Sequence, residues 1–251
     1  MKKTLVLIAA FLFSSVSLIA QEAERLDFNL DLKSNHLWRG ITVTDAPMAA
    51  VDINYALDKN KHLKLGIWGG MGFSDVKDVH YTEINYYINY SKNRFSIGIW
   101  DVFNSSGRAK GAKDNEIFRY DREATGHRFD LRASYIFSES FPLKIEGGPS
   151  FYGDDRKLNG DQRFSTYAEL SYPVIRNHKV NLNAFVGSAF ALNGGESHFY
   201  GNGKNDFDIV NVGITASKDI PVLGYKLPVS ATAMWNPSVK EARVQIAASL
   251  F

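Results

Sequence analysis

Apolar and polar side chains alternate along most of the chain. Leu26, Phe28, Leu30 and Leu32 are apolar, and each residue between them is polar. Successive side chains of a β-strand point to opposite faces, so this alternation predicts a strand with one apolar and one polar face. About twelve segments follow the pattern, and an even strand number is typical of bacterial outer-membrane barrels; they lie near residues 26–33, 51–57, 63–71, 83–90, 95–99, 129–137, 143–151, 164–172, 180–186, 210–216, 225–235 and 244–250. Helical periodicity is nearly absent, so the predicted fold is all-β, a transmembrane antiparallel up-and-down barrel.

The connections between these segments fall into two sets. The short set lies near residues 58–62, 91–94, 138–142, 173–178 and 218–224, and the long, charged and Gly/Asn-rich set includes 103–126, 153–162 and 193–206. Outer-membrane barrels have short periplasmic turns and longer extracellular loops. One assignment of strand direction accounts for both sets.

Aromatic residues on the apolar parity lie near both ends of the predicted strands. Those beside the short turns are Tyr55, Tyr90, Phe95, Phe137, Tyr172 and Tyr225; those beside the long loops are Trp38, Phe73, Phe103, Phe129, Phe151, Phe164 and Trp235. Membrane barrels carry aromatic girdles at both interfaces. A soluble sandwich or calyx is the alternative, but it has no reason to place aromatic ends and aliphatic middles on one face.

A few positions interrupt the strand pattern. Pro149 and Pro228 lie inside predicted strands, where proline removes a ladder donor. Gly147 and Gly148 predict a bulge or bend beside the first of them. The segment from Phe207 begins on the wrong parity, which indicates a bulge near its start.

The amino terminus has the layout of a secretory signal. Lys2 and Lys3 precede an uncharged apolar stretch from Thr4 to Ile19, which predicts a signal peptide over residues 1–20 and a barrel domain over 21–251. After residue 20 no apolar run approaches the length of a spanning helix. The expected location is therefore the outer membrane of a Gram-negative bacterium, and the expected role is transport.

The composition excludes several features and classes of partner. The chain has no cysteine, which excludes disulfides and a lipid-anchored cysteine. It has 29 Lys+Arg and 27 Asp+Glu, and removal of Lys2 and Lys3 makes the two equal. A balanced charge gives no electrostatic case for nucleic acid. Expected partners are outer-membrane lipid and lipopolysaccharide, and the barrel assembly machinery, whose recognition signal the terminal Phe251 resembles.

The end of the first strand carries a local motif. It reads Ser34-Asn35-His36-Leu37-Trp38-Arg39-Gly40-Ile41, followed by Thr44-Asp45 and Pro47. This segment resembles the opening of the Gcw_chp family of bacterial exported proteins of unknown function, which are predicted barrels. His36 stands where an aromatic is common, and Met48-Ala49-Ala50 replaces the family's Gln-Gly-Gly. The resemblance implies an exported barrel and brings no activity.

The motif also has a physical interpretation. We expect Trp38 to anchor at the outer interface and Gly40 to permit the turn into the first loop. Arg39, on the opposite parity, should point inward, where Asp45 could pair with it. These four residues form a candidate strand-end latch, and contact of Arg39 with a ligand is the alternative.

Few residues suggest chemistry. An outer-membrane hydrolase, with Ser165 as nucleophile and His127 or His198 as base, is a minor alternative without a local motif. The spacing of Asp154, Asp155 and Asp161 does not fit a calcium loop. We expect no catalytic residue, metal or cofactor, and no enzyme.

The polar face should line the lumen with charges of both signs. Candidate lining residues are Arg39, Asp52, Lys64, Glu83, Arg132, Lys144, Glu146 and Glu169. Buried charges of mixed sign must pair or be hydrated. The leading hypothesis is a passive, narrow, porin-like channel for small solutes. The alternative is a closed structural or surface-interaction barrel that acts through its extracellular loops.

Overall fold

The computed structural model describes residues 25–177, 179–194 and 197–250. The predicted signal peptide, its cleavage site and Phe251 lie outside these residues. Within the described part of the chain, no helix is long and apolar enough to cross a membrane.

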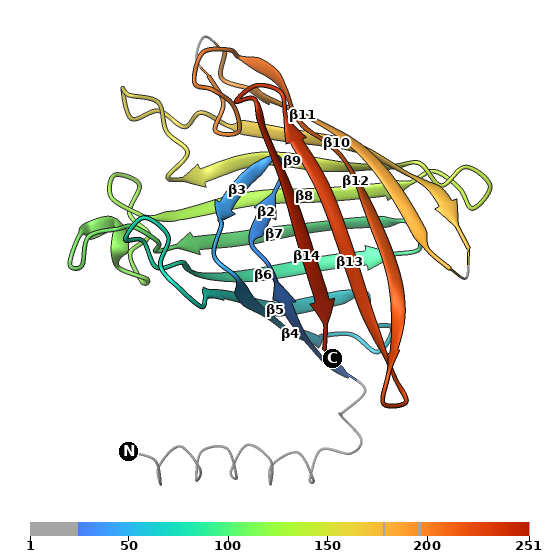
Figure 1. The fold of residues 1–251 in the computed structure, drawn as a ribbon. Helices are drawn as coiled ribbons and strands as arrows, with labels where there is room; N and C mark the ends of the chain where they lie inside the picture. The colour runs from blue at the N-terminus through green and yellow to red at the C-terminus, as the bar shows by residue number, and fades with distance from the viewer. Residues whose placement is uncertain (1–24, 178, 195–196, 251) are drawn as a thin grey trace, which may run out of the picture.

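Twelve antiparallel strands close into one barrel, in which each strand pairs with its neighbours along the chain (Figure 1). The wall strands are β1 (Leu26–Lys33), β4 (Met48–Ala56), β5 (Leu63–Gly72), β6 (Thr82–Lys92), β7 (Phe95–Asn104), β8 (His127–Ile136), β9 (Lys144–Gly153), β10 (Ser165–Arg176), β11 (Asn181–Ala191), β12 (Phe207–Val222), β13 (Tyr225–Asn236) and β14 (Glu241–Ser249). Each overlaps a segment predicted from alternation. The all-β, up-and-down barrel is therefore confirmed.

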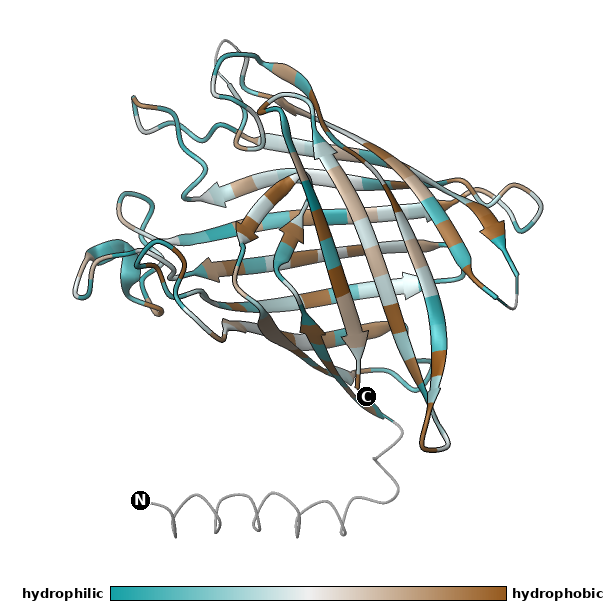
Figure 2. Ribbon diagram, in the orientation of Figure 1, coloured by the Kyte–Doolittle hydropathy of each residue, from teal (hydrophilic) through white to brown (hydrophobic). Residues whose placement is uncertain are grey.

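The apolar parity faces outward. Apolar and polar residues alternate along each wall strand (Figure 2). The exposed apolar side chains include Phe28, Ile53, Leu65, Ile67, Ile88, Ile99, Ile145, Leu170, Val186, Ile214, Val244 and Ile246. Their polar neighbours point into the barrel, so the outer surface is a continuous apolar wall around a polar interior.

The two ends of the barrel differ. The turns after β4, β6, β8, β10 and β12 are short, and that after β12 consists of Leu223 and Gly224 alone. At the opposite end the chain forms long connections, including residues 105–126, which contain the 3₁₀ helix η2 (Lys113–Asn115), 154–164 and 192–206. Figure 1 shows long connections gathered at the left of the barrel.

The predicted irregularities have physical counterparts. Asn211 pairs with Gly187 and Ile209 with Ser188, so Val210 is an extra residue in β12, where the parity predicted a bulge. In β9 the register shifts at Phe151, close to Gly147 and Gly148. A Cβ on either glycine would lie 2.0 Å from a carbonyl oxygen of a neighbouring strand, so the backbone there leaves no room for a side chain.

The barrel closes where β1 meets β14. Asp31, Leu32 and Lys33 pair with Ser249, Ala248 and Ala247 before the chain leaves the wall. Beyond Lys33 the Ser34 amide still donates to the Ile246 carbonyl at 2.8 Å, and side chains extend the pairing: Ser34 Oγ accepts from the Ile246 amide at 2.9 Å, and Asn35 Nδ2 donates to the Val244 carbonyl at 3.1 Å. These bonds satisfy an edge that would otherwise be unpaired.

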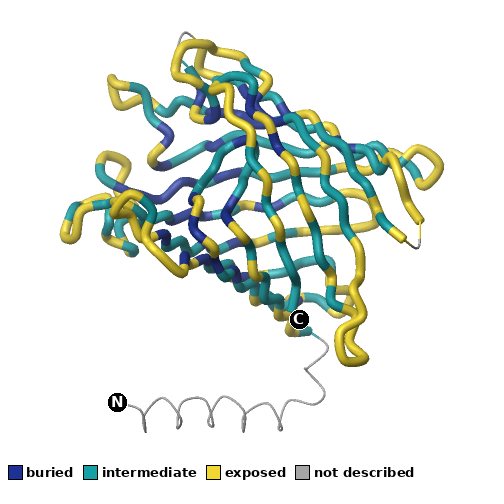
Figure 3. The backbone as a smooth tube through the Cα atoms, in the orientation of Figure 1, coloured by how far each residue is buried: buried dark blue, intermediate teal, exposed yellow. Residues whose placement is uncertain are grey.

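After Asn35 the chain turns into the barrel. Residues 36–44 form a separate two-stranded sheet, β2 (His36–Trp38) and β3 (Ile41–Thr44), which lies between the front and back walls in Figure 1. Buried residues concentrate around it, in the half of the barrel nearest the long connections (Figure 3). The core of the molecule is therefore inside the half of the lumen nearest the long connections.

Candidate functional site in the barrel lumen

The hairpin β2–β3 has a two-residue turn. Arg39 and Gly40 have φ values of 49° and 83°, as the tight turns that suit strand twist require. The sequence interpretation placed this turn at the entrance to an outer loop. It lies inside the lumen instead, because His36 to Thr44 fold back onto the inner wall rather than extending β1.

The tip is anchored by Arg39. Its Nη1 donates to Tyr200 Oη at 3.1 Å and lies 3.9 Å from Asp130 Oδ2. Its guanidinium carbon lies 4.9 Å from the ring centroids of both Trp38 and Tyr167. Asn236 donates to the carbonyls of Gly40 and Tyr200, which ties the turn to β13 and to the 192–206 connection. Segments far apart in sequence thus hold the hairpin in place.

Asp130, on β8, is the centre of a buried charge cluster. It is fully buried and accepts a 2.6 Å bond from Ser150 Oγ. Arg132 Nη2 lies 3.4 Å and Arg128 Nε 3.6 Å from its carboxylate, and Arg39 is the third cation. A single carboxylate therefore faces three arginines. A buried carboxylate is tolerable only with such partners.

Two expectations for the latch are wrong. Trp38 does not lie at the outer interface: three guanidinium groups surround it in the lumen, those of Arg39, Arg128 and Arg132. Asp45 does not pair with Arg39, because it lies 3.5 Å from Arg243 on β14, at the rim. The Trp38 ring therefore makes cation–π contacts instead of lipid contacts.

Trp38, Arg132 and Trp100 lie between two cavities of the lumen. Arg132 lies over the Trp100 ring at 4.1 Å and faces Trp38 at 5.8 Å, and Trp100 stacks on Tyr87 at 4.2 Å. These three residues and Leu37 line both a cavity of about 650 Å³ and a second one of about 400 Å³. The hairpin and these three side chains thus separate parts of two neighbouring cavities.

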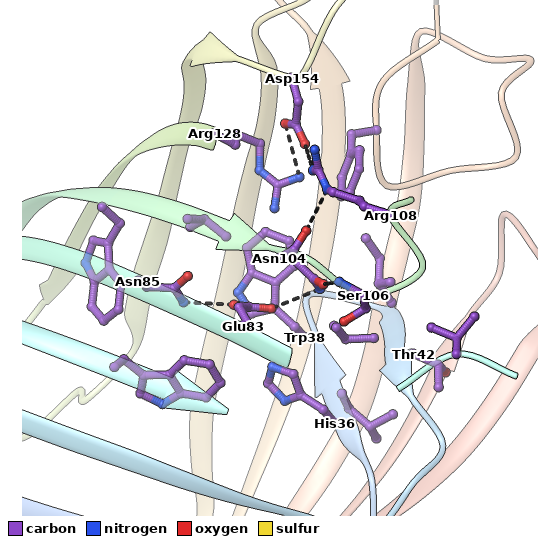
Figure 4. A pocket seen from close by; sticks show the side chains of 18 of the residues that line it. His36, Trp38, Thr42, Glu83, Asn85, Asn104, Ser106, Arg108, Arg128 and Asp154 are labelled. Atoms are coloured by element: carbon purple, nitrogen blue, oxygen red, sulfur yellow. Dashed lines mark hydrogen bonds and ion pairs between the residues drawn. The ribbon is translucent and has the colours of Figure 1, made fainter. Parts of the chain in front are cut away.

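The larger cavity, called the outer cavity below, is bounded by the hairpin, the inner wall and the long connections (Figure 4). Arg108, Asp154 and Arg128 form a chain of ion pairs on one side of it, with distances of 3.2 and 3.9 Å. Burial raises the pKa of the Asp154 carboxyl, although both arginines oppose this shift. Asn85, Glu83 and Asn104 form a hydrogen-bonded row next to these ion pairs, and Arg108 Nε joins the two groups by donating to the Asn104 carbonyl at 2.8 Å.

The other candidate lumen residues lie in separate networks. Asp52 accepts from Tyr87 Oη at 2.7 Å, and Lys64 pairs with Asp27. Lys144 pairs with Glu146, and Glu169 accepts from Tyr167 and Asn211. Glu83 and Arg132 line the outer cavity, whereas Arg39, Arg132, Glu146 and Glu169 line the smaller one. The structure thus places Glu83 and Arg132 at cavities that the hairpin also lines, with Arg39 at the hairpin tip, and leaves Asp52, Lys64 and Lys144 outside both cavities.

The residues considered for hydrolysis do not form a nucleophile–base pair. Ser165 Oγ donates to Asp155 at 2.9 Å and accepts from the Phe199 amide. His127 bonds to Asp101 and to the Ile117 carbonyl, and His198 to Asp208. Burial lowers the pKa of His198. Each group therefore holds loop structure together, and the described residues contain no cluster of three metal-ligating side chains.

Sequence reasoning missed Arg128 and Tyr200 as members of the cluster. Arg128 had a readable signal, because it shares parity with Asp130 and Arg132 on β8 and so belongs to the same inward row. Tyr200 had none. It lies 161 residues from Arg39 in the chain, in a loop whose course the strand pattern does not predict.

Comparisons with known proteins leave the family open. No family model and no curated protein matches the chain. Among solved structures, the chain is similar to a protein described as "Bacterial polysaccharide outer membrane secretin", with 10% identity and a TM-score of 0.36 over 90% of this chain and 96% of the other. This similarity is too low to carry an argument about function.

Proposed function

We propose that this protein is an outer-membrane barrel that its own hairpin holds closed, and that it acts from its outer side, through the outer cavity and the long connections. The observation that carries the proposal is the hairpin inside the lumen, with Trp38, Arg132 and Trp100 between the two cavities. Membership of the Gcw_chp family is a further proposal, which rests on the Ser34–Pro47 motif alone.

The outer face supports the membrane location. A closed barrel leaves no backbone edge, which is a condition for crossing hydrocarbon. Its exposed surface carries aliphatic residues, with exposed aromatic residues such as Phe95, Tyr225 and Trp235 near the strand ends. The partners proposed for this surface are outer-membrane lipid, lipopolysaccharide and the assembly machinery. The short turns would face the periplasm.

A narrow channel is the second candidate function, and one observation favours it. The two cavities share lining residues from the hairpin, Leu37 and Trp38, so a displaced hairpin would join them into one path for small solutes. The tip contacts of Arg39 oppose such a movement. The channel would therefore be gated, with the closed state dominant at rest.

Planar-bilayer recording tests the closed state. Folding is first verified by a heat-modifiable gel shift. We expect few or no openings for the wild type and steady currents after replacement of residues 36–44 by a short Gly-Ser linker. Trp38→Ala, a milder change, should give intermediate activity. Steady wild-type currents would overturn the closed-barrel proposal and favour the channel.

Cysteine labelling tests the orientation. Gly111→Cys lies in an exposed part of a long connection, and Asn60→Cys in an exposed short turn. An impermeant thiol reagent applied to intact cells should label the first and not the second. The reverse result would invert the topology and with it the outward direction of the outer cavity.

A further inference from the structure

Arg128 lies at the outer cavity with donors that the protein does not use. Its side chain is largely buried and forms no hydrogen bond within the described part of the chain; because its Nε is covered, the two terminal nitrogens are the donors that a ligand could reach. Its ion pairs, at 3.6 Å to Asp130 and 3.9 Å to Asp154, are longer than hydrogen bonds. The ring of Phe199 covers the guanidinium at 4.3 Å. A rigid, planar and underused guanidinium is a typical carboxylate-binding group.

The charges beside Arg128 favour an anion. Arg39, Arg128 and Arg132 share Asp130, whereas Asp154 is also held by Arg108. The three inner arginines therefore exceed the carboxylates that reach them. In a partly desolvated cavity such an excess is costly, and a bound anion would offset it.

The row of Asn85, Glu83 and Asn104 presents acceptors to the outer cavity. Glu83 is held in place by bonds from Tyr81, Asn85 and Asn104, at 2.8 to 3.2 Å. The buried Oδ1 of Asn85 has no partner among the described residues. A carboxylate has about four acceptor positions, and the side-chain amide oxygens of Asn85 and Asn104 are acceptors as well. These three residues therefore suit hydroxyl donors rather than a second anion.

Flat aromatic rings complete the outer cavity. Trp38, Trp68, Trp100 and Phe199 all line it, and His36 stacks on Trp68 at 5.5 Å. Rings of this kind provide apolar surface for a planar or ring-shaped body. A volume of about 650 Å³ is within the usual size of small-ligand sites.

We propose that the outer cavity binds a small acidic sugar, with its carboxylate on Arg128 and its hydroxyl groups on Glu83 and Asn104. A ligand of this class matches the basic side, the acceptor side and the aromatic walls at once. The inference takes one point from the proposed function, namely that the outer cavity opens to the outside of the cell. Binding itself requires neither a closed nor an open lumen.

Tryptophan fluorescence of the refolded full-length protein in detergent provides the assay. Three of the four tryptophans line the outer cavity, and Trp235 lies exposed on the outer face. D-Glucuronate should change the emission saturably, whereas glucose, which lacks the charge, and benzoate, which lacks the hydroxyl groups, should bind at least about tenfold more weakly. Trp68→Phe should diminish the signal and Trp235→Phe should leave the ligand-induced change in place.

Two variants separate the halves of the site. Arg128→Gln should weaken glucuronate binding about tenfold or more, because a charge-assisted contact is lost, and Arg128→Lys should lose less. Glu83→Gln should weaken glucuronate binding but leave benzoate binding unchanged or stronger. Arg122→Gln, in an exposed part of the 105–126 connection, is the matched control and should bind like the wild type.

Several results would overturn the proposal. They are absence of saturable glucuronate binding by a correctly folded protein, equal binding of glucose or benzoate, and equal effects of Arg128→Gln and Arg122→Gln. Bilayer recording of the same preparation keeps the two proposals apart. A closed barrel without glucuronate binding contradicts this inference alone, whereas steady currents contradict the proposed function alone.

Discussion

Gly40 packs directly against the backbone of Val210. A Cβ at position 40 would lie 1.9 Å from the Val210 carbonyl oxygen, and Gly40 itself has a φ of 83°. Val210 is the extra residue of the β12 bulge and is fully buried. The bulge and the hairpin turn therefore fit together: one brings a carbonyl inward, and the other leaves room for it.

Gly40→Ala should displace the hairpin tip without preventing barrel formation. The methyl group would collide with wall backbone, which cannot yield as a flexible side chain can. We expect a normal heat-modifiable gel shift together with increased openings in bilayer recordings. Gly111→Ala is the control, because Gly111 has a similar φ of 79° with nothing within 4 Å of its Cβ position. It should lose only about 1 kcal/mol of conformational preference and stay closed. Equal behaviour of the two variants would show that the contact with Val210 does not hold the hairpin.

The wall was predictable because its signal is local. Alternation with period two depends only on which face of a strand meets the apolar surroundings, so it located every wall strand and the parity change at Val210. The predicted short turns lie at the correct ends of the strands, but strands extend into two of them: β10 continues through Pro173 to Arg176, and β12 continues to Val222, so that only Leu223 and Gly224 form its turn.

The hairpin was not predictable in the same way. Leu37, Trp38, Ile41 and Val43 are apolar residues that suit either an outer rim or a packed interior. Their location depends on the turn of the backbone inward after Asn35 and on residues far along the chain: Trp38 and Ile41 pack against a buried cluster that includes Tyr167 and Tyr200. The aromatic-girdle rule misplaced Trp38 for this reason: the sequence of one strand does not distinguish a tryptophan that packs against cations from one that contacts lipid.

Arg39 should be coupled energetically to Asp130 and not to Asp45. Double-mutant cycles on the free energy of unfolding, with Arg39→Ala, Asp130→Asn and Asp45→Asn, measure both pairs. We expect a coupling of about 1 kcal/mol or more for the buried pair and a value near zero for Arg39 with Asp45, because Asp45 lies half exposed beside Arg243. The opposite ranking would restore the latch as the sequence suggested it.

Acidification should loosen the hairpin through His36. Burial, with a smaller contribution from the positive charge of Lys33, lowers the pKa of His36 from 6.5 to about 3. The folded state therefore favours neutral His36. Above pH 6.5 the histidine is neutral in both the folded and the unfolded chain, so it does not reduce stability. As the pH falls from 6.5 towards about 3, the unfolded chain is protonated first, and the free energy of unfolding decreases. Each pH unit in this window costs up to about 1.4 kcal/mol. Wild-type openings should accordingly become more frequent in bilayers as the pH falls below 6.5.

His36→Phe separates this effect from other titrations. Phenylalanine keeps a flat ring between Trp68 and Tyr81, whose centroids lie 5.5 and 5.7 Å from that of His36, and it cannot be protonated. Its opening frequency should stay nearly constant over the same pH range. If the variant shows the wild-type pH dependence, carboxyl groups such as Asp154 are responsible instead.

A charge on the apolar face should impair the barrel, and the same charge one residue away should be tolerated. Leu182 and Asn183 are neighbours on β11, opposite Ala216 and Thr215 of β12, and they lie on the apolar and polar parities respectively. Leu182→Arg would place a guanidinium in hydrocarbon, at a cost of about 2 to 4 kcal/mol at the bilayer midplane. Asn183→Arg would place it in the polar lumen, away from both cavities. The folded fraction in heat-modifiable gels after refolding into lipid vesicles should therefore fall for the first variant and change little for the second. Equal folded fractions would mean that the apolar face does not contact lipid, and the barrel would then have to be soluble.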